Sequence, residues 1–249
     1  LSLMKFVFYP LWLLYRLWFY LLVAVATSIL SPLLFISILR VKWYKFFFQV
    51  ARLWSKLILF GMGCFWTVHW EEHLRAGESY IFIANHTSMI DIMLMFSIVK
   101  NHPFVFVGKQ ELAKIPLFGF FYKRTSILVD RKDSFSRKMV FSQAQDRIKQ
   151  GLSICIFPEG GVPIETVALD SFKIGAFKLS AEHELVLVPI TFLDNKKRFS
   201  FTFFSGGPGR VRALGNKFIN PKDYKKDKIK QMRDKSHHII LESINKDQG

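Results

Sequence analysis

The sequence predicts an α/β fold, a mixed and largely parallel sheet flanked by helices, behind an N-terminal hydrophobic two-helix membrane anchor. Residues 1–66 hold most of the Trp, Leu and Phe runs. From about residue 67, short apolar runs alternate with helical stretches, which is typical of α/β proteins. Polar side chains directly follow several of these runs, where α/β sheets bind their ligands. We therefore divide the chain into an anchor, residues 1–66, and an α/β domain, residues 67–249.

The anchor is predicted from a run of 23 uncharged residues, Leu17–Leu39. As a helix this run extends about 35 Å, enough to cross a hydrocarbon core of about 30 Å. Its length, and the lack of a small-residue cleavage site after it, argue against a cleavable signal peptide. We expect Pro10 and Pro32 to interrupt the helix and residues 43–66 to form a second one.

The charges beside this run give no strong orientation. Basic residues lie both before it (Lys5, Arg16) and after it (Arg40, Lys42, Lys45). The positive-inside rule therefore does not separate the two sides. Two alternatives stay open. One is a helix that spans the membrane, and the other is a helical pair inserted into one leaflet, with both ends cytoplasmic. We favour the inserted pair.

The composition restricts the partners. Lys and Arg number 35 against 19 Asp and Glu, a net charge of +16. Such a charge suits nucleic acid, an anionic membrane or a small anionic substrate, and the apolar N-terminus favours membrane lipids. No zinc-finger spacing or RNA-binding signature is present, so we expect no nucleic-acid partner. The two cysteines, Cys64 and Cys155, give no disulfide framework and fit a reducing cytoplasm, with both thiols in the core.

Apolar runs and capping signals locate the elements of the α/β domain. Asp133–Gln150 is predicted as a helix with Asp133 or Ser134 as its cap, with Met139, Ala144 and Ile148 on one face, and with Gly151 as its stop. A Lys-rich surface helix is expected over Asp223–Asn245. The expected strands are Tyr80–Ala84, Phe104–Val107, Ser126–Val129, Ser153–Phe157, Leu185–Ile190 and Arg198–Phe204, with a further β-like run at Phe65–Val68.

Four chemically useful side chains follow the carboxyl ends of predicted strands: His86, Lys109, Arg131 and Glu159. Ligands of α/β sheets bind outside these strand ends. We therefore expect the four side chains to converge on one pocket.

His86 and Asp91 are the candidate catalytic pair. Five residues on a continuous helix turn through about 500°, so the two side chains meet only if His86 lies in a loop and Asp91 in the following first helical turn. Thr87 or Ser88 can cap that helix, and Asp91 can also be read as a capping residue alone. As a pair, Asp91 fixes the tautomer of His86, whose other nitrogen takes a proton from an attacking hydroxyl. No Ser or Cys in a nucleophile-elbow context accompanies them, which favours direct attack by a substrate alcohol.

Four ordered blocks carry a resemblance to a known family. Asn85–Asp91 resembles the first motif of the glycerolipid acyltransferases, which include the bacterial 1-acyl-sn-glycerol-3-phosphate acyltransferases (lysophosphatidic acid acyltransferases). The resemblance extends over roughly Tyr80 to Phe192. The other blocks are Gly108–Leu112 with Ile115–Gly119 and Val129–Arg131, then Phe157–Gly160, and then Val188–Ile190.

This resemblance implies a site and a reaction. His86 would be the base and Asp91 its partner, and Glu159 with Gly160 would shape the glycerol pocket. Lys109 and Arg131 would lie near the substrate phosphate, which needs such cations. An acyl group would move from acyl-CoA or acyl-carrier protein to the sn-2 hydroxyl of a lysophospholipid, 1-acyl-glycerol-3-phosphate. The product would be phosphatidic acid, and the reaction would need no metal and no organic cofactor.

The resemblance has one departure and leaves alternatives. Many members continue the third block with Thr-Arg-Ser, whereas Gly160 is followed here by Gly161-Val162-Pro163. The family's phosphate-binding Arg is therefore missing, and Lys173 is the candidate to share its load with Arg131. Another acceptor (glycerol-3-phosphate or a lyso-aminolipid) and a non-enzymatic lipid-binding membrane protein stay open. We expect a location at the cytoplasmic membrane, with the α/β domain facing the cytoplasm.

Two other patterns in the sequence allow a second reading. Residues His69-Trp70-Glu71-Glu72-His73 match an inverted zinc-peptidase motif, but that chemistry needs both histidines on one helical face. The β-like Phe65–Val68 before them and Gly77 after them favour a strand instead. The apolar residues Ile115, Leu117, Phe118, Phe120 and Phe121 are read either as a surface that dips into lipid or as core.

Overall fold

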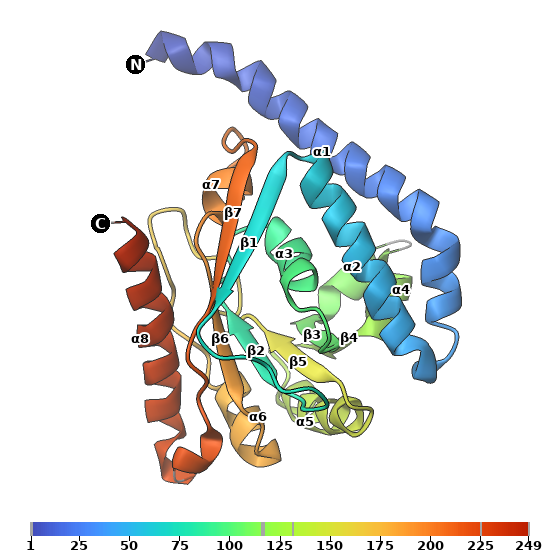
Figure 1. Ribbon diagram of the computed structural model, residues 1–249, viewed down its shortest axis with the longest axis vertical. Coiled ribbons are helices and arrows are strands. Elements are labelled where there is room, and N and C mark those ends of the chain that lie inside the picture. Colours follow the sequence, from blue (N-terminus) through green and yellow to red (C-terminus); the bar gives the residue numbers. More distant parts are fainter. Residues whose placement is uncertain (1, 116–117, 131, 225, 249) are drawn as a thin grey trace.

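The computed structural model describes residues 2–115, 118–130, 132–224 and 226–248 (Figure 1). A seven-stranded sheet forms its centre, in the order β1-β7-β6-β2-β5-β3-β4. Among the strand pairs of the described residues, β6–β7 alone is antiparallel, so the prediction of a mixed and largely parallel sheet is confirmed. The strands are β1 (Cys64–Trp70), β2 (Ile81–Ala84), β3 (Phe104–Lys109), β4 (Ser126–Val129), β5 (Ser153–Ile156), β6 (Leu187–Phe192) and β7 (Gly209–Gly215).

The central strands are apolar because both of their faces are covered. Every residue of β2 and β6 is buried, as expected for strands with helices on either side. Helices α2 (Tyr44–Gly61) and α3 (Ile90–Ile98) cover one face. Helices α6 (Gly175–His183) and α8 (Ile229–Gln248) cover the other (Figure 1). Cys64 and Cys155 are free and buried, as predicted, and burial raises the pKa of both thiols.

The predicted strand Arg198–Phe204 is wrong. Helix α7 (Asn195–Phe199) ends there, and a loop of residues 200–208 leads into β7. The alternating Phe side chains satisfy the strand pattern, but the loop makes only an isolated bridge, from Ser200 to Ser88. The strand that extends the sheet is β7, which pairs with β1 and β6.

Helix α5 (Ser134–Lys149) agrees with its prediction apart from one face. Asp133 is the cap, since its carboxylate accepts hydrogen bonds from the backbone N–H groups of Phe135 and Ser136. Ala144 is buried as expected, but Met139 is 40% exposed, so Met139 does not belong to the core. The C-terminal helix α8 begins at Ile229, later than the predicted Asp223, because 3-10 turns precede it.

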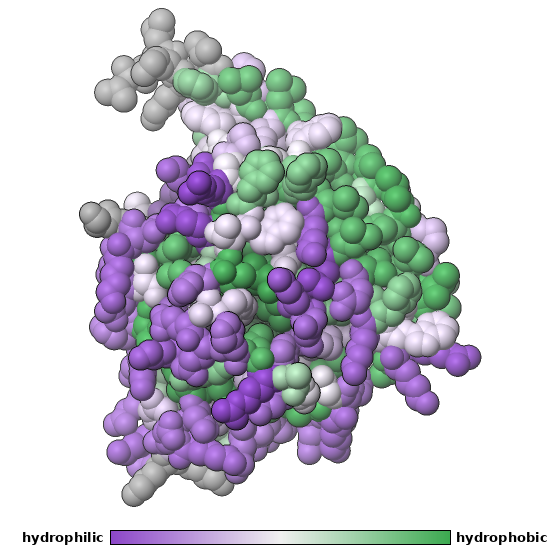
Figure 2. All heavy atoms as spheres, in the orientation of Figure 1, coloured by the Kyte–Doolittle hydropathy of each residue, from purple (hydrophilic) through white to green (hydrophobic). Residues whose placement is uncertain are grey.

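The N-terminal region forms two helices, α1 (Ser2–Ser37) and α2. The expectation that Pro10 and Pro32 interrupt α1 is wrong: the helix continues through both prolines and is curved (Figure 1). Residues Phe8–Ser37 are long and apolar enough to cross a membrane, judged by length and composition alone. Large apolar side chains of α1, such as Leu14, Leu21 and Ile29, remain exposed, and Figure 2 shows the resulting apolar edge over α1 and α2. The division at residue 66 stays a prediction.

Shorter helical elements connect the carboxyl end of β3 to the start of β4. A 3-10 turn (Gln110–Lys114) follows β3, and α4 (Phe118–Thr125) leads into β4. Ile115, Phe118 and Phe120 are between 40% and 48% exposed, and the Phe120 ring stacks on Phe35 of α1. Phe120 thus continues the apolar edge of α1. Leu117 lies outside the described residues.

Candidate active site

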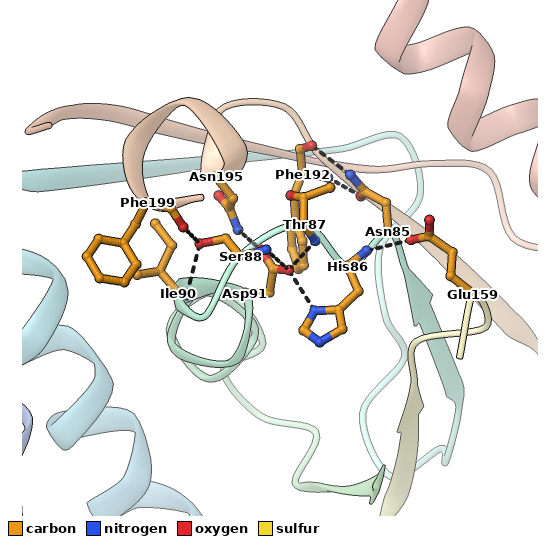
Figure 3. Close-up of polar contacts among 10 residues, drawn as sticks. All are labelled: Asn85, His86, Thr87, Ser88, Ile90, Asp91, Glu159, Phe192, Asn195 and Phe199. Atoms are coloured by element: carbon orange, nitrogen blue, oxygen red, sulfur yellow. Dashed lines mark hydrogen bonds and ion pairs between the residues drawn. The ribbon is translucent and has the colours of Figure 1, made fainter. Parts of the chain in front are cut away.

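His86 and Asp91 meet at the loop between β2 and α3 (Figure 3). The distance from His86 Nδ1 to Asp91 Oδ2 is 2.8 Å. Helix α3 begins at Ile90, so His86 lies in the loop and Asp91 in the first turn. The five-residue spacing therefore brings the two side chains together in the way that the sequence required.

The loop is held by bonds to neighbouring strands and loops. Asn85 exchanges two hydrogen bonds with the backbone of Phe192 at the end of β6, at 3.0 and 2.8 Å. Ser88 Oγ donates to the carbonyl of Phe199 and accepts from the N–H of Ile90. Met89, which makes no side-chain capping bond, occupies the N-cap position, rather than the predicted Thr87 or Ser88.

The protonation pattern of the pair follows from the donors around Asp91. Its Oδ2 atom accepts from the backbone N–H groups of Thr87 at 2.7 Å and Ser88 at 2.9 Å. Because this oxygen is surrounded by donors, Asp91 is an acceptor toward the imidazole as well, so His86 Nδ1 carries the proton. In such a neutral imidazole the other nitrogen, Nε2, is the hydrogen-bond acceptor.

Asn195 is a contact of the pair that the sequence did not predict. Its Nδ2 donates to Asp91 Oδ1 at 2.6 Å, and both side chains are fully buried. Asn195 begins α7, directly after Asp194, whose carboxylate is bound by Arg212 through two side-chain bonds of 2.8 Å. The only local signal was its position shortly after a strand, and 104 residues separate it from Asp91.

Glu159 lies beside the pair and is 3% exposed. Its two carboxylate oxygens accept from the backbone N–H groups of His86 at 2.7 Å and Asp170 at 2.8 Å. Burial raises the pKa of Glu159, and these two bonds offset only part of that rise. Glu159 thus joins the loop after β5 to the loop after β2, while its part in a glycerol pocket stays a prediction.

Aromatic rings border the imidazole. Phe157 stacks on His86 with ring centroids 4.2 Å apart, and Phe201 approaches it edge-on at 6.3 Å. The His86 side chain is 22% exposed. The rings limit the orientations of His86 and leave part of its surface open to a substrate.

Of the three predicted phosphate ligands, Lys109 and Lys173 belong to the described residues. Lys109 ends β3 and is exposed, and β3 is separated from β2 by β5. Lys173 is exposed, and its backbone N–H donates to the carbonyl of Pro158, which keeps it near the turn at Gly160. Gly160 has φ of +81°, a backbone conformation that favours glycine. Arg131 lies outside the described residues.

The zinc-peptidase reading fails on geometry. His69 and Trp70 belong to β1, and Glu71–His73 follow in a non-helical segment, so the two histidines do not share a helical face. Among the residues that the structure describes, no group of three His, Cys, Asp or Glu side chains is placed to hold a metal ion.

Comparisons with known proteins place the similarity mainly in the α/β part of the chain. Residues 66–193 match the family model described as Acyltransferase. The chain is 29% identical over 157 residues to the chloroplastic 1-acyl-sn-glycerol-3-phosphate acyltransferase of Arabidopsis thaliana, covering 61% of this chain and 42% of the relative. It is 28% identical over 172 residues to the 1-acyl-sn-glycerol-3-phosphate acyltransferase of Escherichia coli, covering 67% and 69%.

Among solved structures, the 1-acyl-sn-glycerophosphate acyltransferase of Thermotoga maritima superposes with a TM-score of 0.78 at 20% identity, over 98% of both chains. That similarity concerns the fold. The chain spans only about half the length of the relatives from Arabidopsis thaliana, Chlamydomonas reinhardtii and Brassica napus, between 42% and 57%. The family model covers more than half of this chain and includes His86, Asp91 and Glu159, and the chain belongs to the acyltransferase family.

Proposed function

We propose that this protein transfers a fatty acyl group from acyl-CoA or acyl-carrier protein to the sn-2 hydroxyl of 1-acyl-glycerol-3-phosphate, giving phosphatidic acid. Family membership supports acyl transfer, and the names of the relatives supply the acceptor. The observation that carries the proposal is the 2.8 Å hydrogen bond between His86 Nδ1 and a buried Asp91. In this proposal the bond orients His86 so that Nε2 acts as a base near the carboxyl ends of the parallel strands.

The proposed reaction is a direct displacement. His86 Nε2 takes the proton of the sn-2 hydroxyl while the hydroxyl oxygen attacks the thioester carbonyl. The tetrahedral intermediate then collapses, the C–S bond breaks, and the departing thiolate takes the proton from His86. Asp91 stabilises the imidazolium formed in between, and it keeps its own hydrogen bonds throughout. No covalent acyl-enzyme is needed.

The acceptor is held, in this proposal, by cations at neighbouring strand ends. Lys109, Arg131 and Lys173 bind the phosphate, and Glu159 with Gly160 shapes the space for the glycerol. The order β2-β5-β3-β4 supports this, since these parallel strands end at the same edge. The apolar edge of α1 and α2 anchors the enzyme at the cytoplasmic face of a membrane, where the acceptor resides.

One observation favours a different acceptor. The segment Gly161–Pro163 has no arginine, and Val162 and Ile164 are 37% and 72% exposed. A head group other than a simple phosphate, as in a lyso-aminolipid, would suit such a segment better. The reaction would otherwise be the same.

The test is an assay of the full-length protein in lipid vesicles with labelled acyl-CoA or labelled acyl-carrier protein. Each donor is combined with 1-acyl-glycerol-3-phosphate, glycerol-3-phosphate or a lyso-aminolipid. We expect phosphatidic acid as the main labelled product. Labelled product from another acceptor would replace the substrate in this proposal. No acyl transfer to any acceptor, together with lipid binding, would leave a non-enzymatic lipid-binding protein.

A further inference from the structure

Arg16 is a buried charge in the largely apolar α1. In the sequence it is only the last basic residue before the uncharged run. In the structure it is 3% exposed, while its neighbours Leu14 and Leu17 are 61% and 54% exposed. A buried guanidinium costs free energy unless its N–H groups are bonded. Its partners therefore explain why α1 holds it.

These partners are three carbonyl groups of the loop that replaces the predicted strand. Arg16 donates to the carbonyls of Ser200, at 2.6 Å, and of Thr202 and Phe203. Its guanidinium also lies over two rings, 4.8 Å from the centroid of Phe199 and 5.0 Å from that of Phe203. A planar fork with five N–H donors suits several carbonyls at once, which a lysine ammonium does not match.

Other residues of α1 bind the same loop. Phe19, one turn after Arg16, packs on Phe199, the last residue of α7 directly before the loop, with ring centroids 4.4 Å apart. Nearer the N-terminus, Tyr9 meets Phe204 edge-on at 4.7 Å. The loop thus lies beneath α1, between α7 and β7 (Figure 1).

The opposite side of the loop contacts the catalytic pair. Ser200 forms a β-bridge with Ser88, and the backbone N–H of Ser88 donates a hydrogen bond to Asp91. In the sequence, Phe201 lies between Ser200 and Thr202, whose carbonyls Arg16 binds, and its ring lies 6.3 Å from that of His86 in a T-shaped arrangement. One short loop is therefore bonded to the anchor helix on one side and borders the catalytic imidazole on the other.

We propose that Arg16 is a positioning residue, which holds loop 200–204 so that Phe201 keeps His86 in its reactive orientation and so couples the seating of α1 to catalysis. The inference rests on the proposed function. It assigns Arg16 no contact with the substrate. It explains why the largely apolar α1 carries a charged side chain on its buried face.

The test compares Arg16→Met, which removes the donors and keeps an unbranched side chain, with Arg16→Lys. The matched control is Arg40→Met, the same change at an exposed position just after α1. In vesicles, Arg16→Met should lower kcat about 10- to 100-fold, as expected for a catalytic group displaced by about 1 Å. Arg16→Lys should fall between it and the wild type. KM and the fraction that sediments with vesicles should stay close to wild type in all three variants.

A second readout does not depend on activity. Chymotrypsin cleavage after Phe201, Phe203 and Phe204, followed by mass spectrometry, reports the opening of the loop. Cleavage should be faster in Arg16→Met than in Arg40→Met. Wild-type kcat in Arg16→Met, or a loss of activity that only follows a loss of vesicle binding, would overturn the proposal. So would faster cleavage with unchanged kcat.

Two outcomes need separate treatment. If Arg16→Met does not fold, Phe201→Leu decides, because Phe201 is 48% exposed and its loss leaves the core intact. We expect a lowered kcat at unchanged KM, and wild-type kcat in Phe201→Leu would overturn the proposal. If the wild type itself transfers no acyl group, the proposed function fails, and the cleavage rates alone decide whether Arg16 holds the loop.

Discussion

At the scale of single residues, Asp91 is the centre of the candidate site. Four N–H donors converge on its carboxylate, from the His86 ring, from the backbone of Thr87 and Ser88, and from the side chain of Asn195. A buried carboxylate bonded on all sides keeps a fixed position. The imidazole that it orients is then directed toward the partly open side of the site.

Replacement of His86 by Asn should remove the proposed general base and keep a polar side chain that can reach Asp91. We expect kcat to fall about 10²- to 10⁴-fold, the usual contribution of a general base. Circular dichroism should match the wild type, since the imidazole lies at the surface of the site. Substantial residual turnover in a folded His86→Asn protein would exclude His86 as the base.

Asn195 offers a test of how the pair is positioned. Asn195→Ala removes one donor to a buried carboxylate, and we expect kcat to fall about 10-fold, in line with a hydrogen bond to a charged group. Asn195→Asp places a second carboxylate against Asp91. The pH at which kcat/KM rises should then move upward, because the extra charge holds the His86 proton more tightly.

The control for these variants is Asn101→Ala, an exposed residue just before β3, at the opposite edge of the sheet. A pH profile of Asn195→Asp identical to that of the wild type would show that Asn195 does not act through the pair.

Arg131 is the residue for which a kinetic test matters most. If it binds the acceptor phosphate, Arg131→Ala should raise KM for 1-acyl-glycerol-3-phosphate about 10-fold or more, the cost of a lost charge-assisted hydrogen bond. The value of kcat should change less. Lys132→Ala, at the exposed neighbouring position, is the control. Equal KM values in the two variants would argue for a solvated role of Arg131.

At the scale of elements, α1 has two faces with different tasks. One face is buried and includes Arg16, Phe19, Leu30 and Leu34. The other exposes leucines and aromatic residues along the apolar edge (Figure 2). The first face packs against the rest of the protein, and the second is exposed. This arrangement suits insertion of α1 into one leaflet of a membrane as well as a helix that spans it.

The proposed lipid contact of α1 is tested by the paired change Leu14→Glu and Leu21→Glu. Both side chains are more than half exposed, so the fold should persist. A charge at hydrocarbon depth costs about 2.5–3.5 kcal/mol, so the double variant should shift from the vesicle pellet to the supernatant on sedimentation. Lys235→Glu on α8 changes the net charge equally and should stay in the pellet. Unchanged sedimentation of the double variant would assign the anchor to α2 or to the catalytic face.

At the scale of the whole molecule, Arg212 joins three distant segments. Lying on β7, it binds Asp194 before α7 and Asp247 near the end of α8, at 2.6–2.8 Å. Burial alone would raise the pKa of Asp194, but the bonds and charge of Arg212 outweigh it and lower the pKa. Asp194 thus adds stability that is present above its ordinary pKa of 3.8 and is lost as the pH falls through the lowered value.

Arg212→Met should therefore lower the melting temperature near pH 7. We expect about 1 kcal/mol, since Arg212 is 41% exposed and solvent screens it, which corresponds to about 2–4 °C for a chain of this size. The difference from wild type should shrink below pH 4. Arg210→Met, an exposed change on the same strand, is the control. Equal melting temperatures for the two variants would mean that this network adds no net stability.

Local patterns were sufficient for much of this molecule. Strand β4 has the predicted bounds, and β2, β3 and β5 differ from prediction by one or two residues. The loop-to-helix junction at His86 also followed from five neighbouring residues. These features depend on side chains that are close in the sequence, so periodicity and capping chemistry report them directly.

The sequence by itself determined the α/β class, the apolar N-terminal helices and the resemblance to the acyltransferases. Only the tertiary structure decided that residues 200–208 form a loop, that Asn195 binds Asp91 and that Glu159 is enclosed by backbone donors. Phe-Ser-Phe-Thr-Phe alternates like a strand, but its carbonyl groups are bound by Arg16, some 185 residues earlier, rather than by a neighbouring strand. A hydrogen bond between such distant segments exists only once the chain is packed, and no local pattern in the sequence encodes it.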